Sequence, residues 1–331
     1  MSEGFMRKLG RSGIEVSALG LGCWAIGGPF FYNGMSDGWG DVDDNESINA
    51  LHRAFELGIN FLDTADCYGV GHSEKVIGKA IAGKRHSIVV ATKFGNFGNE
   101  ATKTLHGTNL TPDYIERACD ASLKRLNTDY IDVYQLHEWN ISVSDVEPIC
   151  TTLDKLVEKG KIRTYGWSTD LVDGARLFAE RANCSVIMHT LNVFEDSSRL
   201  VKLCENNNLA SINRSPLGMG FLSGKFTSES LISKDDVRGA GHPWVPFFKD
   251  GKPVPEFLKA LDSVKEILTS NGRTLVQGAL SWIWGKSGST VPIPGFKTTK
   301  QVEEIAKAMS FGPFSQAQMK EIDQILYQRD R

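Results

Sequence analysis

The segment INFLDTADCYGVGHSEKVIGKAIAG, residues 59–83, contains two structural patterns in succession. The segment 59–65 is short and mainly apolar, which is typical of a buried strand. Residues 73–83 have the pattern of a helix. A buried strand followed directly by a helix is the unit from which parallel sheets are built, so this segment predicts an α/β fold.

The same alternation recurs along the whole chain. Eight segments have the pattern of strands, namely 18–24, 59–65, 87–93, 130–137, 162–169, 185–192, 209–215 and 289–295. Eight strand–helix units predict a closed (β/α)8 TIM barrel. An open doubly wound sheet is the alternative. It is disfavoured because no early G-x-G-x-x-G motif follows a strand and opens a helix.

Three segments lie outside the repeat. Residues 6–17 alternate around a Gly turn, which predicts an N-terminal β-hairpin at the floor of the barrel. A Gly-rich loop is expected between residue 93 and a helix that opens at Thr111 and Pro112. Residues 221–256, after the seventh strand, predict a long loop, and loops of that length are usually functional lids or disordered. We expect a single domain over residues 1–331.

The composition excludes several classes of function. With 41% hydrophobic residues, 23% charged residues and a net charge of −3, there is no electrostatic case for binding nucleic acid. No apolar run is long enough to span a membrane, and the polar N-terminus does not resemble a signal peptide. The six cysteines show neither C-x-x-C nor metal-type spacing, so we expect reduced thiols, no metal and a cytoplasmic protein. A monomer or a weak homo-oligomer is expected.

Polar residues stand at the carboxyl ends of three successive predicted strands. They are Asp63, Lys93 and His137, and Tyr68 follows in the loop after the first of them. Each alone has an ordinary explanation as a cap, a snorkelling lysine or a hydrogen-bonded core histidine. Strand ends of a barrel face one mouth, so together they predict a catalytic cluster. In it, Lys93 would neutralise Asp63 and lower the pKa of Tyr68, making the phenol a usable general acid.

Seven motifs resemble the aldo-keto reductase family, and the resemblance covers nearly the whole chain. They are LGLGCW, GINFLDTADCYG, VVATK, DYIDVYQLH, GWST, SPLGMGFLSGK and VPIPGFKTTKQVEE. The resemblance implies a (β/α)8 barrel that uses NAD(P)H to reduce aldehydes and ketones. It also implies a catalytic tetrad of Asp63, Tyr68, Lys93 and His137. Tyr68 would protonate the carbonyl oxygen, and His137 would orient it.

The resemblance also implies the cofactor site, with several departures from the family pattern. Thr169 replaces the usual Asn, Met188 the usual Gln, Arg214 the usual stacking Tyr and Gln301 the usual Arg. Lys297 and Thr298 match the turn that holds the adenosine 2′-phosphate, so NADPH is expected to be preferred and NADH to bind more weakly. The complete expected set is Trp24, Ser168, Thr169, Met188, Arg214, Ser215, Pro216, Leu217, Gly295, Lys297, Thr298, Gln301 and Glu304.

Aromatic residues near the predicted mouth suggest the substrate. Trp24, Phe30 and Trp139 are expected to line a pocket for apolar or aromatic carbonyl compounds, although loop packing is the simpler explanation for such residues. The partner is thus a small-molecule carbonyl substrate. Some members of the superfamily serve as channel-associated subunits. The alternative function is therefore a regulatory subunit that binds NADPH and senses redox state with little turnover.

Overall fold

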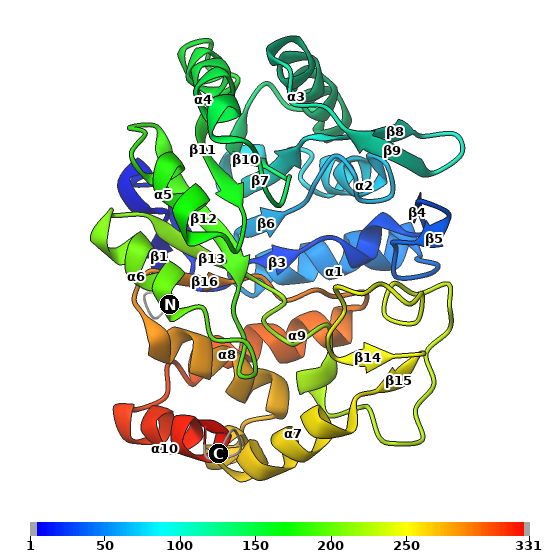
Figure 1. Ribbon diagram of the computed structural model, residues 1–331, viewed down its shortest axis with the longest axis vertical. Helices are drawn as coiled ribbons and strands as arrows, with labels where there is room; N and C mark the ends of the chain where they lie inside the picture. Colours follow the sequence, from blue (N-terminus) through cyan, green and yellow to red (C-terminus); the bar gives the residue numbers. More distant parts are fainter. Residues whose placement is uncertain (1–4, 328–331) are drawn as a thin grey trace.

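Eight parallel strands form the centre of the protein in the computed structural model, which describes residues 5–327 (Figure 1). In the order of the sheet they are β16 (Thr290–Pro292), β13 (Ala210–Arg214), β12 (Cys184–Thr190), β11 (Ile162–Ser168), β10 (Ile131–Leu136), β7 (Val89–Phe94), β6 (Phe61–Asp63) and β3 (Leu21–Gly22). A parallel bridge between Gly22 and Gly295 joins the two ends of this order. The predicted barrel is confirmed.

The first and last strands are shorter than the sequence suggests. The segments predicted at 18–24 and 289–295 contribute only two and three residues of regular strand. Pro292 lies in the last strand and Pro294 follows it, and proline has no N–H to give to a sheet. The Pro292 carbonyl still accepts from the Gly20 amide at 3.0 Å, and the Pro294 carbonyl accepts from the Gly22 amide at 2.9 Å. The barrel therefore closes through a few backbone bonds at this seam.

Helices surround the strands (Figure 1). Those that follow the eight strands are α1 (Asp44–Glu56), α2 (His72–Ala80), α3 (Pro112–Leu126), α4 (Val143–Glu158), α5 (Val172–Ala179), α6 (Ser198–Asn206), α8 (Leu275–Lys286) and α9 (Thr299–Lys307). Two more, α7 (Pro255–Leu268) and α10 (Gln316–Tyr327), lie beyond α8 at the bottom of the view. Within residues 5–327, none of the helices combines the length and apolarity needed to cross a membrane.

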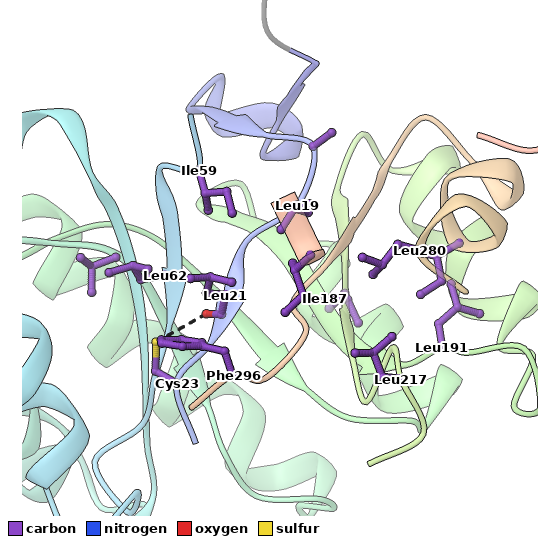
Figure 2. Packing of buried hydrophobic residues seen from close by; sticks show 14 of the residues in the cluster. Leu19, Leu21, Cys23, Ile59, Leu62, Ile187, Leu191, Leu217, Leu280 and Phe296 are labelled. Carbon is purple, nitrogen blue, oxygen red and sulfur yellow. Dashed lines mark hydrogen bonds between the residues drawn. The ribbon is translucent and has the colours of Figure 1, made fainter. Parts of the chain in front are cut away.

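Two apolar layers hold the barrel together. Alternate strand residues, including Phe61, Val133 and Ile212, fill its interior, and the intervening residues pack against the helices. Figure 2 shows part of the outer layer, with Leu62 and Phe296 among its labelled residues. This alternation decides which polar side chains can enter the barrel.

The predicted hairpin closes one end of the barrel. Strands β1 (Met6–Lys8) and β2 (Glu15–Ser17) pair antiparallel. Leu9, Ile14 and Val16 are buried in the same cluster as the interior strand residues. The hairpin lies at the left of Figure 1, opposite the loops on the right. Ligands must therefore enter from the end at which the strands terminate.

The loops at that open end are more ordered than expected. The expected Gly-rich loop after Lys93 is instead a hairpin of β8 (Asn96–Asn99) and β9 (Thr104–Thr108). It forms a four-stranded sheet with β4 (Phe31–Tyr32) and β5 (Met35–Ser36). The long segment after β13 contains β14 (Phe248–Lys249) and β15 (Lys252–Pro253), and α7 begins before its predicted end.

This long segment is bonded to the loop that follows β5. Ser36 Oγ donates to the carbonyl of Asp235 at 2.7 Å, and the amide of Val237 donates to Gly38 at 2.8 Å. We call residues 36–43 and 233–242 together the strap. The strap joins an early and a late part of the chain at the open end of the barrel.

Candidate active site

Strand alternation brings the predicted catalytic residues to one place. Asp63 follows interior Phe61 by two residues, Lys93 follows Val89 and Ala91, and His137 follows Val133 and Gln135 along β10. Residues two apart on a strand point to the same side. Asp63, Lys93 and His137 therefore continue the inward-facing rows of neighbouring strands, at the ends that face the open mouth.

Lys93 is the centre of this cluster. Its Nζ donates to Asp63 Oδ1 at 2.6 Å, to the Thr64 carbonyl at 2.7 Å and to Tyr68 Oη at 3.1 Å. The side chains of Lys93 and Asp63 are only 1% and 2% exposed. Gln135 Nε2 donates to the other Asp63 oxygen at 3.1 Å. Both buried charges are thus paired and hydrogen-bonded, as burial requires.

The predicted pKa of Tyr68 was wrong in direction. Burial raises the pKa of the phenol above its ordinary value, and this outweighs the lowering by Lys93, while Asp63 raises it further. The ammonium of Lys93 is visible in the sequence, whereas the desolvation of the phenol depends on how the loops cover it. Tyr68 consequently keeps its proton at neutral pH. Lys93 is also buried, but Asp63 and Tyr68 hold its pKa above the ordinary value.

His137 stands beside Tyr68 as a neutral base. The two rings meet edge to face with centroids 5.9 Å apart. Burial lowers the pKa of His137 well below its ordinary value, with Lys93 and Arg214 adding to the effect. His137 Nδ1 lies 3.5 Å from Cys67 Sγ. The imidazole therefore stays uncharged at neutral pH and can hydrogen-bond an oxygen placed near the phenol.

Tryptophans cover the mouth above Tyr68. Trp24 stacks on Tyr68 with centroids 5.7 Å apart, and Trp244 stacks on Trp24 at 6.2 Å. Trp139 is 58% exposed beyond the strand end. Phe30 is instead 1% exposed and packs in a small core with Ala65, Cys67 and Leu105. For Phe30 the structure therefore shows loop packing and no open surface for a substrate.

Two residues predicted to bind the cofactor, Ser168 and Thr169, lie at the end of β11. Ser168 is the buried last residue of the strand. Thr169 Oγ1 donates to the Trp139 carbonyl at 3.0 Å and accepts from the Leu171 amide at 3.1 Å. The Thr169 hydroxyl therefore stabilises the loop after β11. Met188, in the neighbouring strand, is buried in the barrel interior.

Arg214 ends β13 and forms an ion pair with Asp170. Asp170 also accepts from the Thr190 amide at 2.8 Å. The sequence analysis missed Asp170, although its place directly after the GWST motif was a signal. Next to Arg214, Ser215 has a φ of 53°, which is unusual for a residue with a side chain. Pro216 and buried Leu217 continue this tight turn.

The turn that is predicted to bind the 2′-phosphate, before α9, forms hydrogen bonds with other parts of the protein. Lys297 Nζ donates to the carbonyls of Trp39 at 2.5 Å and Asp41 at 3.2 Å, so it is fastened to the strap. Thr298 and Gln301 form the capping box of α9, and Gln301 Oε1 also accepts from the Lys297 amide at 2.8 Å. Thr298 and Gln301 thus bond each other at the N-terminus of α9.

Two further expected cofactor residues lie around α9. Gly295, which precedes this turn, pairs with Gly22 at the barrel seam. Glu304 is half-buried on α9, and its carbonyl accepts from Gln277 Nε2 at 3.1 Å. Both therefore have structural contacts of their own.

Cationic side chains gather beside Lys297. Arg238 pairs with Asp236 at 2.6 Å, and its guanidinium lies 4.6 Å from the Trp39 ring centroid. Burial lowers the pKa of Lys225, and Arg238 lowers it further. The sequence analysis did not single out Lys225 or Arg238, because they lie in the long segment after β13. Carboxylates accompany these cations, since Asp236 pairs with Arg238 and Asp41 acts on Lys297. At the N-terminus of α9, Glu46 Oε1 accepts from the Thr299 amide at 2.8 Å.

Comparison with known proteins agrees with this geometry. The model of the Aldo/keto reductase family matches residues 18–327. The chain is 31% identical over 321 residues to aldo-keto reductase YhdN of Bacillus subtilis (strain 168), covering 95% of this chain and 91% of that protein. It is 33% identical over 325 residues to the aldo-keto reductase yakc of Schizosaccharomyces pombe (strain 972 / ATCC 24843), named with NADP(+), covering 96% and 89%.

A solved structure shares the whole architecture. The glycerol dehydrogenase AKR11B4 from Gluconobacter oxydans superposes with a TM-score of 0.83 at 28% identity, covering 98% of this chain and 95% of that one. The family match spans nearly all of the barrel, and the two relatives match over almost their full lengths. This chain therefore belongs to the aldo/keto reductase family of NAD(P)H-dependent oxidoreductases.

Proposed function

We propose that this protein reduces aldehydes and ketones to alcohols with NADPH, and that Tyr68 is the general acid. The observation that carries the proposal is the chain of contacts from Asp63 through Lys93 to the Tyr68 hydroxyl. The nicotinamide, when bound, supplies the hydride that adds to the carbonyl carbon. Tyr68 Oη gives its proton to the carbonyl oxygen, which completes the alcohol. Lys93, held by Asp63, stabilises the phenolate that remains.

The residues around the mouth fit a phosphate-rich cofactor. Lys225, Arg238 and Lys297 lie near one another, and positively charged side chains suit the phosphates of NADPH. The relative named with NADP(+) supports the same choice. Lys297 would have to turn from the strap carbonyls to reach a 2′-phosphate. NADH, which has no such phosphate, is therefore expected to bind more weakly.

The aromatic residues at the mouth of the barrel support a preference for certain substrates. Trp24, Trp139 and Trp244 provide a largely apolar rim near Tyr68, which favours apolar or aromatic carbonyl compounds. The alternative of a redox sensor with little turnover is not favoured, because both curated relatives are named as reductases.

Replacement of Tyr68 tests the proposed mechanism. Tyr68→Phe removes the phenolic proton and keeps the ring that Trp24 stacks on. With 4-nitrobenzaldehyde as substrate, we expect kcat to fall by roughly 10²-fold or more, the usual size of a general-acid contribution. NADPH binding, followed by tryptophan fluorescence, should persist.

A matched variant controls for the loss of a tyrosine hydroxyl at the mouth. The hydroxyl of Tyr114 donates to the Asn96 carbonyl at 2.7 Å, away from Lys93. Tyr114→Phe should therefore leave kcat nearly unchanged. A Tyr68→Phe enzyme that turns over at the wild-type rate would show that another group supplies the proton.

A further inference from the structure

The proposed catalytic histidine, His137, lies close to two other side chains that can bind a metal, Asp66 and Cys67. Asp66 and Cys67 directly precede Tyr68, and His137 follows β10. One ligand atom from each lies within 4.8 Å of the ligand atoms of the other two. A thiolate, an imidazole and a carboxylate together are a donor set that Zn²⁺ takes in proteins, with water in the fourth position. Sequence spacing could not reveal this set, because Cys67 and His137 are 70 residues apart.

The distances fit a tetrahedral ion. Zn–S and Zn–N bonds of about 2.3 and 2.0–2.1 Å place the sulfur and nitrogen about 3.6 Å apart at a tetrahedral angle. Cys67 Sγ and His137 Nδ1 already lie 3.5 Å apart. A carboxylate oxygen would stand about 3.4–3.6 Å from both, so Asp66 needs to move by little more than about 1 Å.

Asp66 is the member that lacks a partner. Among the described residues, neither of its buried carboxylate oxygens has a hydrogen bond. The neighbouring carboxylates are compensated, since Asp63 pairs with Lys93 and Glu74 with Arg125. An unpartnered buried carboxylate costs free energy, and a cation would recover it.

We propose that Asp66, Cys67 and His137 form a binding site for a soft divalent cation such as Zn²⁺. Binding replaces the Cys67 S–H bond with a Zn–S bond and releases the proton to water. Burial raises the pKa of this thiol and that of the Asp66 carboxyl group, so a proton on Asp66 must also leave to water, and both shifts work against binding. Of the three side chains, His137 is the one that is partly exposed. The site does not depend on the proposed function, although it shares His137 with it.

Cobalt provides the direct test, because Co²⁺ bound by a thiolate in a tetrahedral site absorbs strongly by ligand-to-metal charge transfer. Titration of the full chain with Co²⁺ should produce this band with one equivalent, and Zn²⁺ should abolish it. Cys67→Ala should remove the band and weaken Zn²⁺ binding by at least about 100-fold, more than the loss of an outer-shell partner. Asp66→Asn, which keeps the shape, should weaken binding and leave a thiolate band.

A second buried cysteine is the matched control. Cys204 lies on α6 and is fully buried, so Cys204→Ala removes a comparable thiol elsewhere. This variant should keep both the band and the affinity. A weak octahedral Co²⁺ spectrum in the wild-type protein, or a thiolate band that persists in Cys67→Ala, would overturn the proposal.

Activity gives a separate readout that rests on the proposed role of His137. Zn²⁺ bound to Nδ1 would fix the orientation of the imidazole, and it would move Asp66, which lies two residues before Tyr68. We therefore expect Zn²⁺ to inhibit aldehyde reduction at the same concentration at which it displaces Co²⁺. A chelator should restore the rate. Displacement of Co²⁺ without inhibition would contradict the role of His137 in reduction and leave the metal site standing, whereas loss of the band contradicts the site itself.

Discussion

Replacing Lys93 with methionine tests the buried ion pair at the base of the site. Met fills similar space but removes the charge that compensates Asp63. Both groups are almost completely buried, so the single change leaves a carboxylate uncompensated in a low-dielectric interior. Breaking such a pair typically costs about 3–5 kcal/mol, far more than the loss of an exposed pair. We expect the free energy of unfolding of Lys93→Met to fall by that amount.

The double variant separates charge from packing. In Lys93→Met/Asp63→Asn, the carboxylate is replaced by an amide whose oxygen can still accept from Gln135. Most of the lost stability should return, giving a coupling of about 2–3 kcal/mol between the two sites. Equilibrium urea unfolding without cofactor, followed by circular dichroism and tryptophan fluorescence, measures each free energy.

A surface lysine provides the reference for the loss of a lysine as such. Lys75 pairs with Glu100 in solvent, where 41% and 53% of the two side chains are exposed. Lys75→Met should therefore change stability far less than Lys93→Met. A Lys93→Met protein as stable as Lys75→Met, or a double variant no more stable than the single one, would refute the reasoning.

Three further changes address the cofactor turn, the end of β13 and a buried histidine of β12. Lys297→Ala should raise the KM for NADPH about tenfold, near 1.4 kcal/mol for one charge-assisted contact, while a parallel rise for NADH would show that Lys297 only anchors the strap. Arg214→Tyr should tighten NADP⁺ more than NADPH, because the oxidised ring is cationic, and titrations that show equal changes would contradict this. Burial lowers the pKa of His189 from 6.5 to about 4, so the folded protein favours the neutral ring while the unfolded chain binds a proton below pH 6.5. Stability should thus fall between pH 6.5 and 4, and His189→Gln should remove about 3 kcal/mol of that acid sensitivity in urea unfolding at several pH values.

The strand ends were predictable because a parallel barrel places them at one mouth. That rule alone places Asp63, Lys93 and His137 together, and the contacts of Lys93 agree with it. The position of the strand ends does not indicate how deeply the loops cover the mouth. The stacking of Trp24 on Tyr68 contributes to that cover, and burial reverses the expected direction of the phenol pKa.

Contacts between loops were not predictable for a related reason. Lys297 bonds the strap across some 250 residues of chain. Arg214, at the end of β13, meets Asp170, which lies two residues beyond the end of β11. Neither contact follows from local periodicity or composition. The β8–β9 hairpin was missed because its Gly-rich sequence carries no strand alternation. Family resemblance identifies the positions of such residues but not the partners they have in this chain.

The seam between β3 and β16 determines when the barrel can be completed during synthesis. Of the eight barrel strands, the first to be synthesised is the neighbour of the last, through the bridge of Gly22 with Gly295. Until then, one edge of β3 is unpaired, and exposed strand edges are prone to association between chains. Closure also brings together segments of very large sequence separation, which slows folding. The nascent chain therefore carries an open sheet until β16 and the residues after it have been synthesised.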